Sequence, residues 1–383
     1  MTDLHTILTT LPDAVMASAH AAARDPLALV RINTSLGPGP FALIVLFISP
    51  QADPAALATE AAALFPDTPV IGCTTAGEIS SQGYAEGQIV ALAFPAALFA
   101  TERLFIPDLT ALHPEPLVSD MIRARQRLAA LNPGWDGEFA FLMVDGMSLR
   151  EDELAAALAM GLGPVPLFGG SAGDGMRFQK TFVLHEGNAH RNAAVLTFLR
   201  TRCPVKVFNL DHLIPTTTRM VVTSADPSQR IVRQINAEPA ALEYARLLGK
   251  DPTQLTTFTF AAHPVVVRIG GRHHVRSIQS MAPNGDLVFF SAIDEGLVLT
   301  LAEPQNMVTH LETELAKLGT PAAIIACDCI LRRIEAEEKQ MFGQISNVLK
   351  SHRILGFSTY GEQMGALHVN QTMTGVAIYA PKP

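Results

Sequence analysis

Three short glycine-rich stretches are the residues of this sequence best suited to chemistry. They read GCTTAGE at 72–78, FGGSAGD at 168–174 and GFSTYGE at 356–362. In each stretch glycines flank small hydroxyl residues, and a carboxylate closes it. Glycines leave the backbone amides of a tight bend uncovered, so amides and hydroxyls together can bind an anion or the polar groups of a small ligand. The alternative is that each carboxylate only accepts backbone N–H groups and fixes the bend.

The same elements precede every turn. An apolar strand, a helix and a second strand are expected at 41–48, 53–65 and 69–71, again at 139–146, 150–161 and 164–168, and again at 322–330, 331–350 and 352–357. Asp53-Pro54 predicts the start of the first helix, and Ser148 with Glu151 predicts a capping box at the second. From Phe41 to Gly72, Phe139 to Phe168 and Ala323 to Gly356 the chain runs 31, 29 and 33 residues.

A spacing of about 30 residues is typical of a strand–helix–strand unit. Another apolar strand follows each turn, at 88–94, at 181–187 with 193–199, and at 374–380. We therefore expect an α/β fold with internally repeated strand–helix–strand–turn units, whose mixed sheets are covered by helices.

The C-terminal half has more predicted antiparallel strand and thus α+β character. The segment IPTTT at 214–218 has a proline and no apolar periodicity, so we take it as the linker between an N-terminal domain, 1–215, and a C-terminal domain, 216–383. A hairpin at Asp226-Pro227 and a helix at 238–249 are expected next, followed by strands at 258–269, 272–281, 286–293 and 296–302.

Composition excludes several classes of protein. Hydrophobic residues make up 48% and charged residues 17%, which supplies a core, and no apolar run approaches the roughly 20 residues of a membrane span. The net charge is −8 (28 basic against 36 acidic residues) without a basic cluster, so nucleic acid is a poor partner. Four scattered cysteines favour a reducing compartment, and Asp3 and His5 stand where a secretion signal would be basic. We expect a cytoplasmic protein.

Some residues of the turns could act as nucleophiles. GGSAG at 169–173 matches the nucleophile elbow of α/β-hydrolases, but the residues after Ser171 have strand character where the elbow requires a helix. Cys73 follows a glycine and is expected to be a small buried residue. Cys327 and Cys329 are too few for a zinc site. We expect no enzyme, with a hydrolase that uses a Ser, Thr or Cys of a turn as the alternative.

Two histidines stand out because each lies in an otherwise apolar or amide-rich strand. They are His263 and His368. A buried imidazole needs a hydrogen-bond partner, and either ring could instead contact a ligand or bind haem iron. His368, Asn370 and Gln371 follow the third turn directly, so we expect them to face whatever that turn holds.

Several motifs resemble those of the FIST family. PVIGCTTAGEI is similar to the signature of the N-terminal FIST domain. Several further motifs resemble the C-terminal FIST domain: EPAALEYARLLG, HPVVVRIGG with HHVRS, NGDLVFFSAIDEG, CDCILRR, and GFSTYGEQ leading to HVNQT. The resemblance covers nearly the whole chain, and the last motifs are most similar to the free-standing nitric-oxide-sensing FIST haemoproteins.

This resemblance implies a sensor. It would bind a small ligand and pass the signal to a separate histidine kinase, diguanylate cyclase or phosphodiesterase, and it could form a homo-oligomer. The ligand would be haem with nitric oxide, held axially by His368 or His263, or a small polar metabolite such as an amino acid. The expected pocket lies where the two halves meet, with the ligand-binding residues Thr75, Glu78, Arg276, Ser358, Thr359, Tyr360, Glu362, His368, Asn370 and Gln371.

Overall fold

The body of the protein consists of three repeats of one α/β unit. The computed structural model describes residues 15–269 and 271–381, so the N-terminal residues considered for a secretion signal lie outside it. The first repeat contains β1 (Ala17–Ala22), α1 (Ala28–Leu36), β2 (Phe41–Ile48), α2 (Pro54–Leu64), β3 (Val70–Thr74), β4 (Glu78–Ser80), β5 (Gly83–Ala85) and β6 (Gln88–Pro95).

The second and third repeats have the same order of elements. The second contains β7 (Phe99–Ile106), a 3₁₀ turn (Leu109–Ala111), α3 (Pro114–Leu131), β8 (Gly137–Val144), α4 (Glu151–Leu162), β9 (Leu167–Ser171), β10 (Val183–His185), β11 (Asn188–His190) and β12 (Ala194–Thr201). The third contains β13 (Val205–Leu210), α7 (Met307–Ala316), β22 (Ala323–Cys329), α8 (Ile330–Glu338), α9 (Phe342–Ser351), β23 (Ile354–Thr359), β24 (Glu362–Met364), β25 (Leu367–Val369) and β26 (Met373–Ile378).

Each of the three sheets is completed by a hairpin from another repeat. The sheet orders are β1-β6-β2-β3-β10-β11, β7-β12-β8-β9-β24-β25 and β13-β26-β22-β23-β4-β5. The hairpin after the first turn therefore pairs with β23, the one after the third turn with β9, and the one after the second turn with β3. This exchange links the repeats in a ring, so strands from both halves of the chain share sheets.

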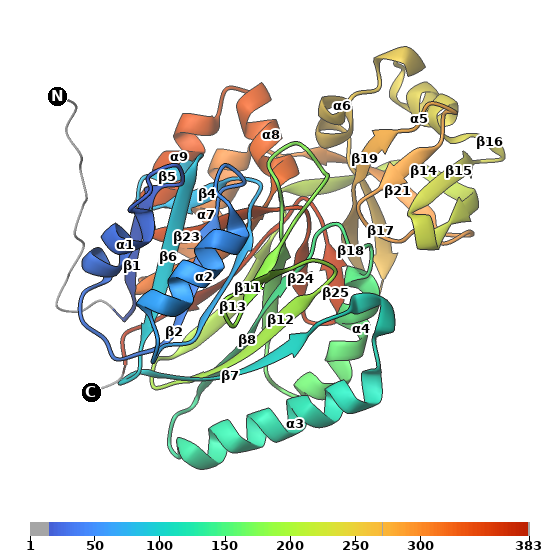
Figure 1. Cartoon of the computed structure of the whole chain (residues 1–383). Coiled ribbons are helices and arrows are strands. Elements are labelled where there is room, and N and C mark those ends of the chain that lie inside the picture. The colour runs from blue at the N-terminus through green and yellow to red at the C-terminus, as the bar shows by residue number, and fades with distance from the viewer. Residues whose placement is uncertain (1–14, 270, 382–383) are drawn as a thin grey trace.

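A further domain is inserted into the third repeat between β13 and α7. It contains β14 (Leu213–Asp226), β15 (Ile231–Ile235), β16 (Glu238–Pro239), α5 (Ala240–Leu248), α6 (Thr257–Ala262), β17 (Val265–Ile269), β18 (Arg272–Arg276), β19 (Ile278–Met281), β20 (Leu287–Phe289), β21 (Val298–Pro304) and two 3₁₀ turns (Pro227–Gln229 and Pro252–Gln254). Its strands form one antiparallel sheet of their own. The inserted domain stands beside the body at the upper right of Figure 1.

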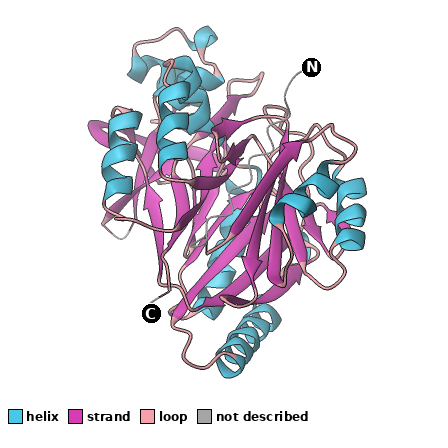
Figure 2. Ribbon diagram, turned by 90° about the vertical axis from the view of Figure 1, so that its left-hand side faces the viewer, coloured by secondary structure: helices cyan, strands magenta, loops and turns pink. Residues whose placement is uncertain are grey.

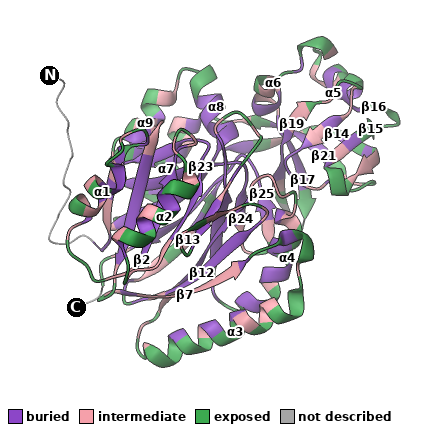
Figure 3. Cartoon of the chain, in the orientation of Figure 1, coloured by how far each residue is buried: buried purple, intermediate pink, exposed green. Residues whose placement is uncertain are grey.

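The main core lies between the three sheets. Phe47 of β2 stacks on Phe357 of β23 with ring centroids 4.6 Å apart, and Phe141 of β8 stacks on Phe168 at 4.9 Å. Cys73 packs in the same cluster, so the expectation of a small buried residue is confirmed. Helices cover the outer faces of the sheets (Figure 2), and Figure 3 shows that the strands are largely buried whereas the outer sides of the helices are exposed.

The α/β fold with repeated units is confirmed, since β2–β3, β8–β9 and β22–β23 are the parallel pairs of three strand–helix–strand units. Asp53 caps α2 as expected, accepting from the backbone N–H groups of Ala55 and Ala56. No helix in the described part of the chain is long and apolar enough to cross a membrane.

Four local predictions are wrong. The segment 331–350 forms two helices because the chain turns at Gln340, whose φ is +56°. Ser148 does not cap α4, which begins after Arg150 without a side-chain cap. Residues 257–262 form α6, whose N-terminus is capped by a Thr256 capping box, where the beginning of a strand was expected. The expected linker, 214–218, lies in β14, where its pairing with β21 is interrupted between Pro215 and Arg219. The domain boundary near 215 stays a prediction.

Candidate ligand site where the three turns meet

The three glycine-rich turns lie against one another at one end of the body. Their backbones are joined by hydrogen bonds from Ala76 N–H to Ser358 O (2.9 Å), from Gly173 N–H to Thr74 O (3.0 Å) and from Ser171 N–H to Gly361 O (2.8 Å). Because each bond joins a different pair of turns, the turns form one closed unit to which all three repeats contribute.

Two of the turn carboxylates hold equivalent positions. Glu78 accepts from the Thr75 hydroxyl (2.5 Å) and from the backbone N–H of Gln88 (3.0 Å). Glu362 accepts from the Thr359 hydroxyl in the same way, and from the backbone and hydroxyl of Thr372. Both carboxyl groups are buried, so their partners fix the bends as the scaffold interpretation predicts.

Burial also changes the acidity of these two groups. It raises the pKa of Glu78 to about 7, although the hydrogen bond from Thr75 acts to lower that pKa, and it raises the pKa of Glu362 to about 8. The charged form loses its hydration when the group is buried, which disfavours ionisation. A large fraction of both groups therefore carries a proton at neutral pH.

The second turn departs from the expected repeat. In the pairing of the exchanged hairpins, Glu78 lies opposite Phe357 and Glu362 lies opposite Gly170. At the equivalent position of the remaining sheet, Val183 lies opposite Cys73, so a valine takes the place of the carboxylate residue. Asp174 was expected there and lies instead in a longer loop between β9 and β10. Its carboxylate accepts from the backbone N–H groups of Gln179 (3.0 Å) and Lys180 (2.8 Å), which stabilises that loop.

Tyr360 of the third turn closes this loop against the turns. Its hydroxyl donates to the Asp174 carboxylate and accepts from the N–H groups of Asp174 (3.0 Å) and Phe178 (3.2 Å). Its ring stacks on Phe178 with centroids 4.4 Å apart. The aromatic residue that distinguishes the third turn thus fixes the long loop of the second.

A cavity of about 340 Å³ opens beside this contact. The first turn, the long loop and α8 form its walls, and all three repeats contribute. Helix α8 presents one stripe to it, because residues three and four positions apart share a helix face. Its lining residues are Ser49, Pro50, Gln51, Ala76, Gly77, Glu78, Glu86, Gly87, Asp174, Gly175, Met176, Arg177, Ile330, Arg333, Ile334 and Glu337.

Arg333 is the principal buried cation of the cavity wall, with 3% of its side chain exposed. Its guanidinium donates to the Ala85 carbonyl (3.1 Å), to Glu86 (3.0 Å) and to Glu337 (3.4 Å). The Glu86 side chain is 72% exposed, so a ligand anion can replace it without burying a new unpaired charge. Gly77 touches the guanidinium, and a Cβ there would lie 2.8 Å from Arg333 Cζ.

The expected residues Arg276, His368, Asn370 and Gln371 lie in a buried polar layer between the body and the inserted domain. An Arg276 guanidinium N–H donates to the His368 carbonyl (3.1 Å), and the Gln371 amide donates to the Ala261 carbonyl of α6 (2.6 Å). Asn370 reaches toward the Tyr360 carbonyl (3.5 Å). Tyr360 therefore stands between this layer and the cavity.

His368 does not fit a haem. Its imidazole is 2% exposed, accepts from the Gln363 amide (3.2 Å) and donates to the Phe290 carbonyl (3.3 Å), so both ring nitrogens have partners. Burial lowers its pKa and favours the neutral ring. His263 lies at the C-terminus of α6, half-buried, in place of the expected strand. The described residues include no group of three or more His, Cys, Asp or Glu that could hold a metal ion.

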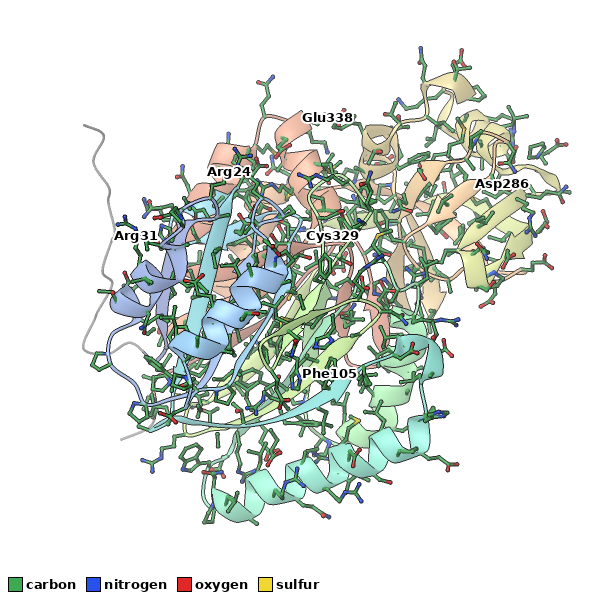
Figure 4. All side chains as sticks on the ribbon, in the orientation of Figure 1. Arg24, Arg31, Phe105, Asp286, Cys329 and Glu338 are labelled. Carbon is green, nitrogen blue, oxygen red and sulfur yellow. The ribbon has the colours of Figure 1, made fainter. Side chains whose placement is uncertain are left out.

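The possible nucleophiles differ in their partners. The Ser171 hydroxyl accepts from the Gln363 amide (3.0 Å), and burial raises the pKa of the Cys73 thiol well above its usual range. The Thr75 and Thr359 hydroxyls donate to Glu78 and Glu362. Cys327 and Cys329 are buried and free, and Cys329 lies in the middle of the molecule in Figure 4. Cys73, Cys327 and Cys329 all lie in hydrophobic clusters of buried residues.

The structure divides the expected site residues into two groups. Thr75, Glu78, Ser358, Thr359, Tyr360 and Glu362 build the turns, and only Glu78 among them lines the cavity. Sequence reasoning missed Arg333, Glu337 and Gln363. The motif CDCILRR carries a family resemblance, and the helical spacing of Ile330, Arg333, Ile334 and Glu337 is the signal in the sequence that marks one face of α8.

Comparison with known proteins places this geometry in a family. The FIST N domain model matches residues 42–238, and the FIST C domain model matches residues 240–365. The chain belongs to the FIST family. FIST domains are sensory ligand-binding domains of signalling proteins. Their two matched regions meet at α5, whose first residue is Ala240.

Similarity to individual known proteins is weak. Among curated proteins no match was found. A chorismatase crystal structure at 1.08 Å resolution is similar with a TM-score of 0.35 and 9% identity, over 96% of this FIST chain and 100% of that chain. At this TM-score the likeness carries no argument about activity.

Proposed function

We propose that this FIST protein is a sensor that binds a small polar metabolite, such as an amino acid, in the cavity beside the first turn. The observation that carries the proposal is the buried guanidinium of Arg333 in the wall of a cavity of about 340 Å³, a size that suits small ligands. An anionic group of the ligand would replace Glu86 on Arg333. Asp174, Glu337 and Glu78 also line the cavity, where they would lie beside the other polar groups of the ligand.

Helix α8 supports a signalling role because its two faces contact different parts of the molecule. One face lines the cavity through Arg333. From the other, Arg332 contacts His212 Nδ1 (2.9 Å) and Glu335 contacts His212 Nε2 (2.9 Å). His212 immediately precedes the inserted domain, and its carbonyl accepts from Gln305 N–H (2.7 Å) at the domain's other end. A ligand that shifts α8 would thereby move the base of the inserted domain.

A polar ligand suits the cavity better than haem does. Half of the sixteen lining residues are polar or charged, and no histidine is among them. Catalysis is not proposed, because Ser171 is bonded to an amide and Cys73 is in the core. A cytoplasmic location, a possible homo-oligomer, and output to a separate histidine kinase, diguanylate cyclase or phosphodiesterase remain part of the proposal.

The test is a ligand screen on the full-length protein. Amino acids and other small polar metabolites are tested for a rise in melting temperature, and the best ligand is then measured by calorimetry. Losing a buried charge pair with the ligand costs about 2 kcal/mol or more, so Arg333→Met should raise Kd at least about 30-fold. Exposed Arg123 on α3 offers the control variant, Arg123→Met, whose Kd should equal that of the parent.

Two results would count against this assignment. One is an affinity unchanged by Arg333→Met, which would place the ligand elsewhere. The other is a stoichiometric Soret band on adding haem that disappears in His368→Ala, which would favour the haem alternative over a polar metabolite.

A further inference from the structure

Among the described residues, one buried arginine has no carboxylate partner. Arg230, Arg332 and Arg333 are buried, and each forms an ion pair, with Glu151, Asp328 and Glu86 respectively. Arg276 is 7% exposed and forms no ion pair with any described residue. Its guanidinium donates only to the carbonyls of Val275 (3.3 Å) and His368 (3.1 Å), and its Nε has no partner among the described residues.

Other buried polar atoms without a partner belong to residues that contact His368 or that lie next to its neighbours in the chain. Gln363, whose amide nitrogen contacts the His368 ring, has an unbonded Oε1, and Asn370 has an unbonded Oδ1. Ser291, next to the Phe290 carbonyl that His368 contacts, has an unbonded hydroxyl. Buried polar atoms are normally hydrogen-bonded, so several unbonded atoms in one layer are unusual. Arg276 contributes a donor, the two amides contribute acceptors, and the serine can do either.

No carboxylate among the described residues forms an ion pair with Arg276. Asp152 and Asp294 favour its charged form from a greater distance, but Asp152 faces Arg230 (3.5 Å) and accepts from the N–H of Ala292 (3.1 Å). Burial lowers the pKa of Arg276, yet an arginine stays charged in proteins. A buried cation without a counter-charge is costly, and an anion placed beside it removes that cost.

We propose that the layer between body and inserted domain is a second binding site, which takes a small carboxylate that also carries a hydrogen-bond donor. The carboxylate pairs with Arg276, and the donor bonds the free oxygens of Asn370 and Gln363. A guanidinium can donate two parallel hydrogen bonds to a carboxylate. The single positive charge of one guanidinium balances a monoanion better than a phosphate dianion. Such a ligand joins β18 of the inserted domain to β24 and to the residue that follows β25 in the body. This site is independent of the cavity at Arg333.

The experiment uses glycolate, which has one carboxylate and one hydroxyl donor, on the full-length protein. The melting temperature in sodium glycolate is compared with that in sodium chloride at equal ionic strength, and Kd is measured by calorimetry. We expect glycolate to raise the melting temperature more than acetate does, and Arg276→Met to raise the glycolate Kd at least about 30-fold. Arg276→Lys keeps the charge but not the planar guanidinium, so its glycolate Kd should lie between those of the parent and Arg276→Met.

A matched control separates this site from general salt effects. Arg268→Met, at an exposed arginine on the neighbouring strand β17, should keep the glycolate effect. Equal melting temperatures in glycolate and chloride would overturn the proposal. So would a glycolate effect that survives Arg276→Met, or protection by phosphate but not by carboxylates.

Discussion

Replacing Gly77 by alanine tests how tightly the first turn packs against α8. Gly77 has φ +137°, a conformation that residues with a Cβ rarely adopt, and the added Cβ would lie 2.8 Å from Arg333 Cζ. The guanidinium cannot move away easily, because Ala85, Glu86 and Glu337 hold it and it lies over the rings of Tyr84 and Phe342. The substitution therefore forces either the turn or Arg333 to shift.

The expected cost has two parts. A strained backbone conformation costs about 1–3 kcal/mol, and overpacking in a fixed environment costs a further 1–3 kcal/mol, roughly. Gly77→Ala should thus lower the free energy of unfolding by about 2–6 kcal/mol. Gly365 is the control, since its φ is +58° and no atom lies within 4 Å of an added Cβ. Gly365→Ala should cost only about 1–2 kcal/mol.

Urea denaturation of the single variants and of Gly77→Ala with Arg333→Ala separates the two parts. Removing the guanidinium should reduce the cost of Gly77→Ala to the backbone part, about 1–3 kcal/mol. If Gly77→Ala costs no more than Gly365→Ala, and Arg333→Ala does not change that cost, the packing argument is refuted.

Three further predictions concern the buried polar groups. The pKa of Glu362 is about 8 in the folded protein and lower in the unfolded chain, so the contribution of Glu362 to stability is full below the unfolded pKa and is lost as pH rises through about 8. The urea midpoint should therefore fall with rising pH, and it should fall less steeply in Glu362→Gln. Equal slopes of urea midpoint against pH in the variant and the parent would contradict this. Tyr360→Phe leaves Asp174 short of a donor and should cost about 1–3 kcal/mol while speeding amide exchange at Asp174 and Phe178; unchanged exchange would count against the contact. Arg230→Met strands Glu151 and should cost about 3–5 kcal/mol, whereas Arg276→Met in chloride should be neutral or stabilising; equal costs would refute the difference in pairing.

The sequence predicted the local units well because local patterns determine them. Apolar runs and helix caps such as Asp53 located the strands and helices around each turn, and the glycines located the bends. The scaffold alternative, in which turn carboxylates accept backbone N–H groups and fix the bends, agrees with the partners of Glu78 and Glu362, whereas the ligand-binding role expected for both residues stays a prediction.

The pairing between repeats could not be read from sequence, because nothing local shows that β4–β5 joins β23 and not its own sheet. For the same reason Asp174 was aligned with the other carboxylates, although the longer second loop puts Val183 in their place. Arg333 was missed since a charged residue on a polar helix usually faces solvent. The exchanged hairpin β4–β5, together with Gly77 and Phe342, covers it.

A structure of the protein crystallised with its best ligand from the metabolite screen would test the sensor assignment most directly. The account predicts ligand density in the cavity beside the first turn, with an anionic group on Arg333 and Glu86 turned away. Density at another site, or an empty cavity at saturating ligand with Arg333 still paired to Glu86, would contradict it.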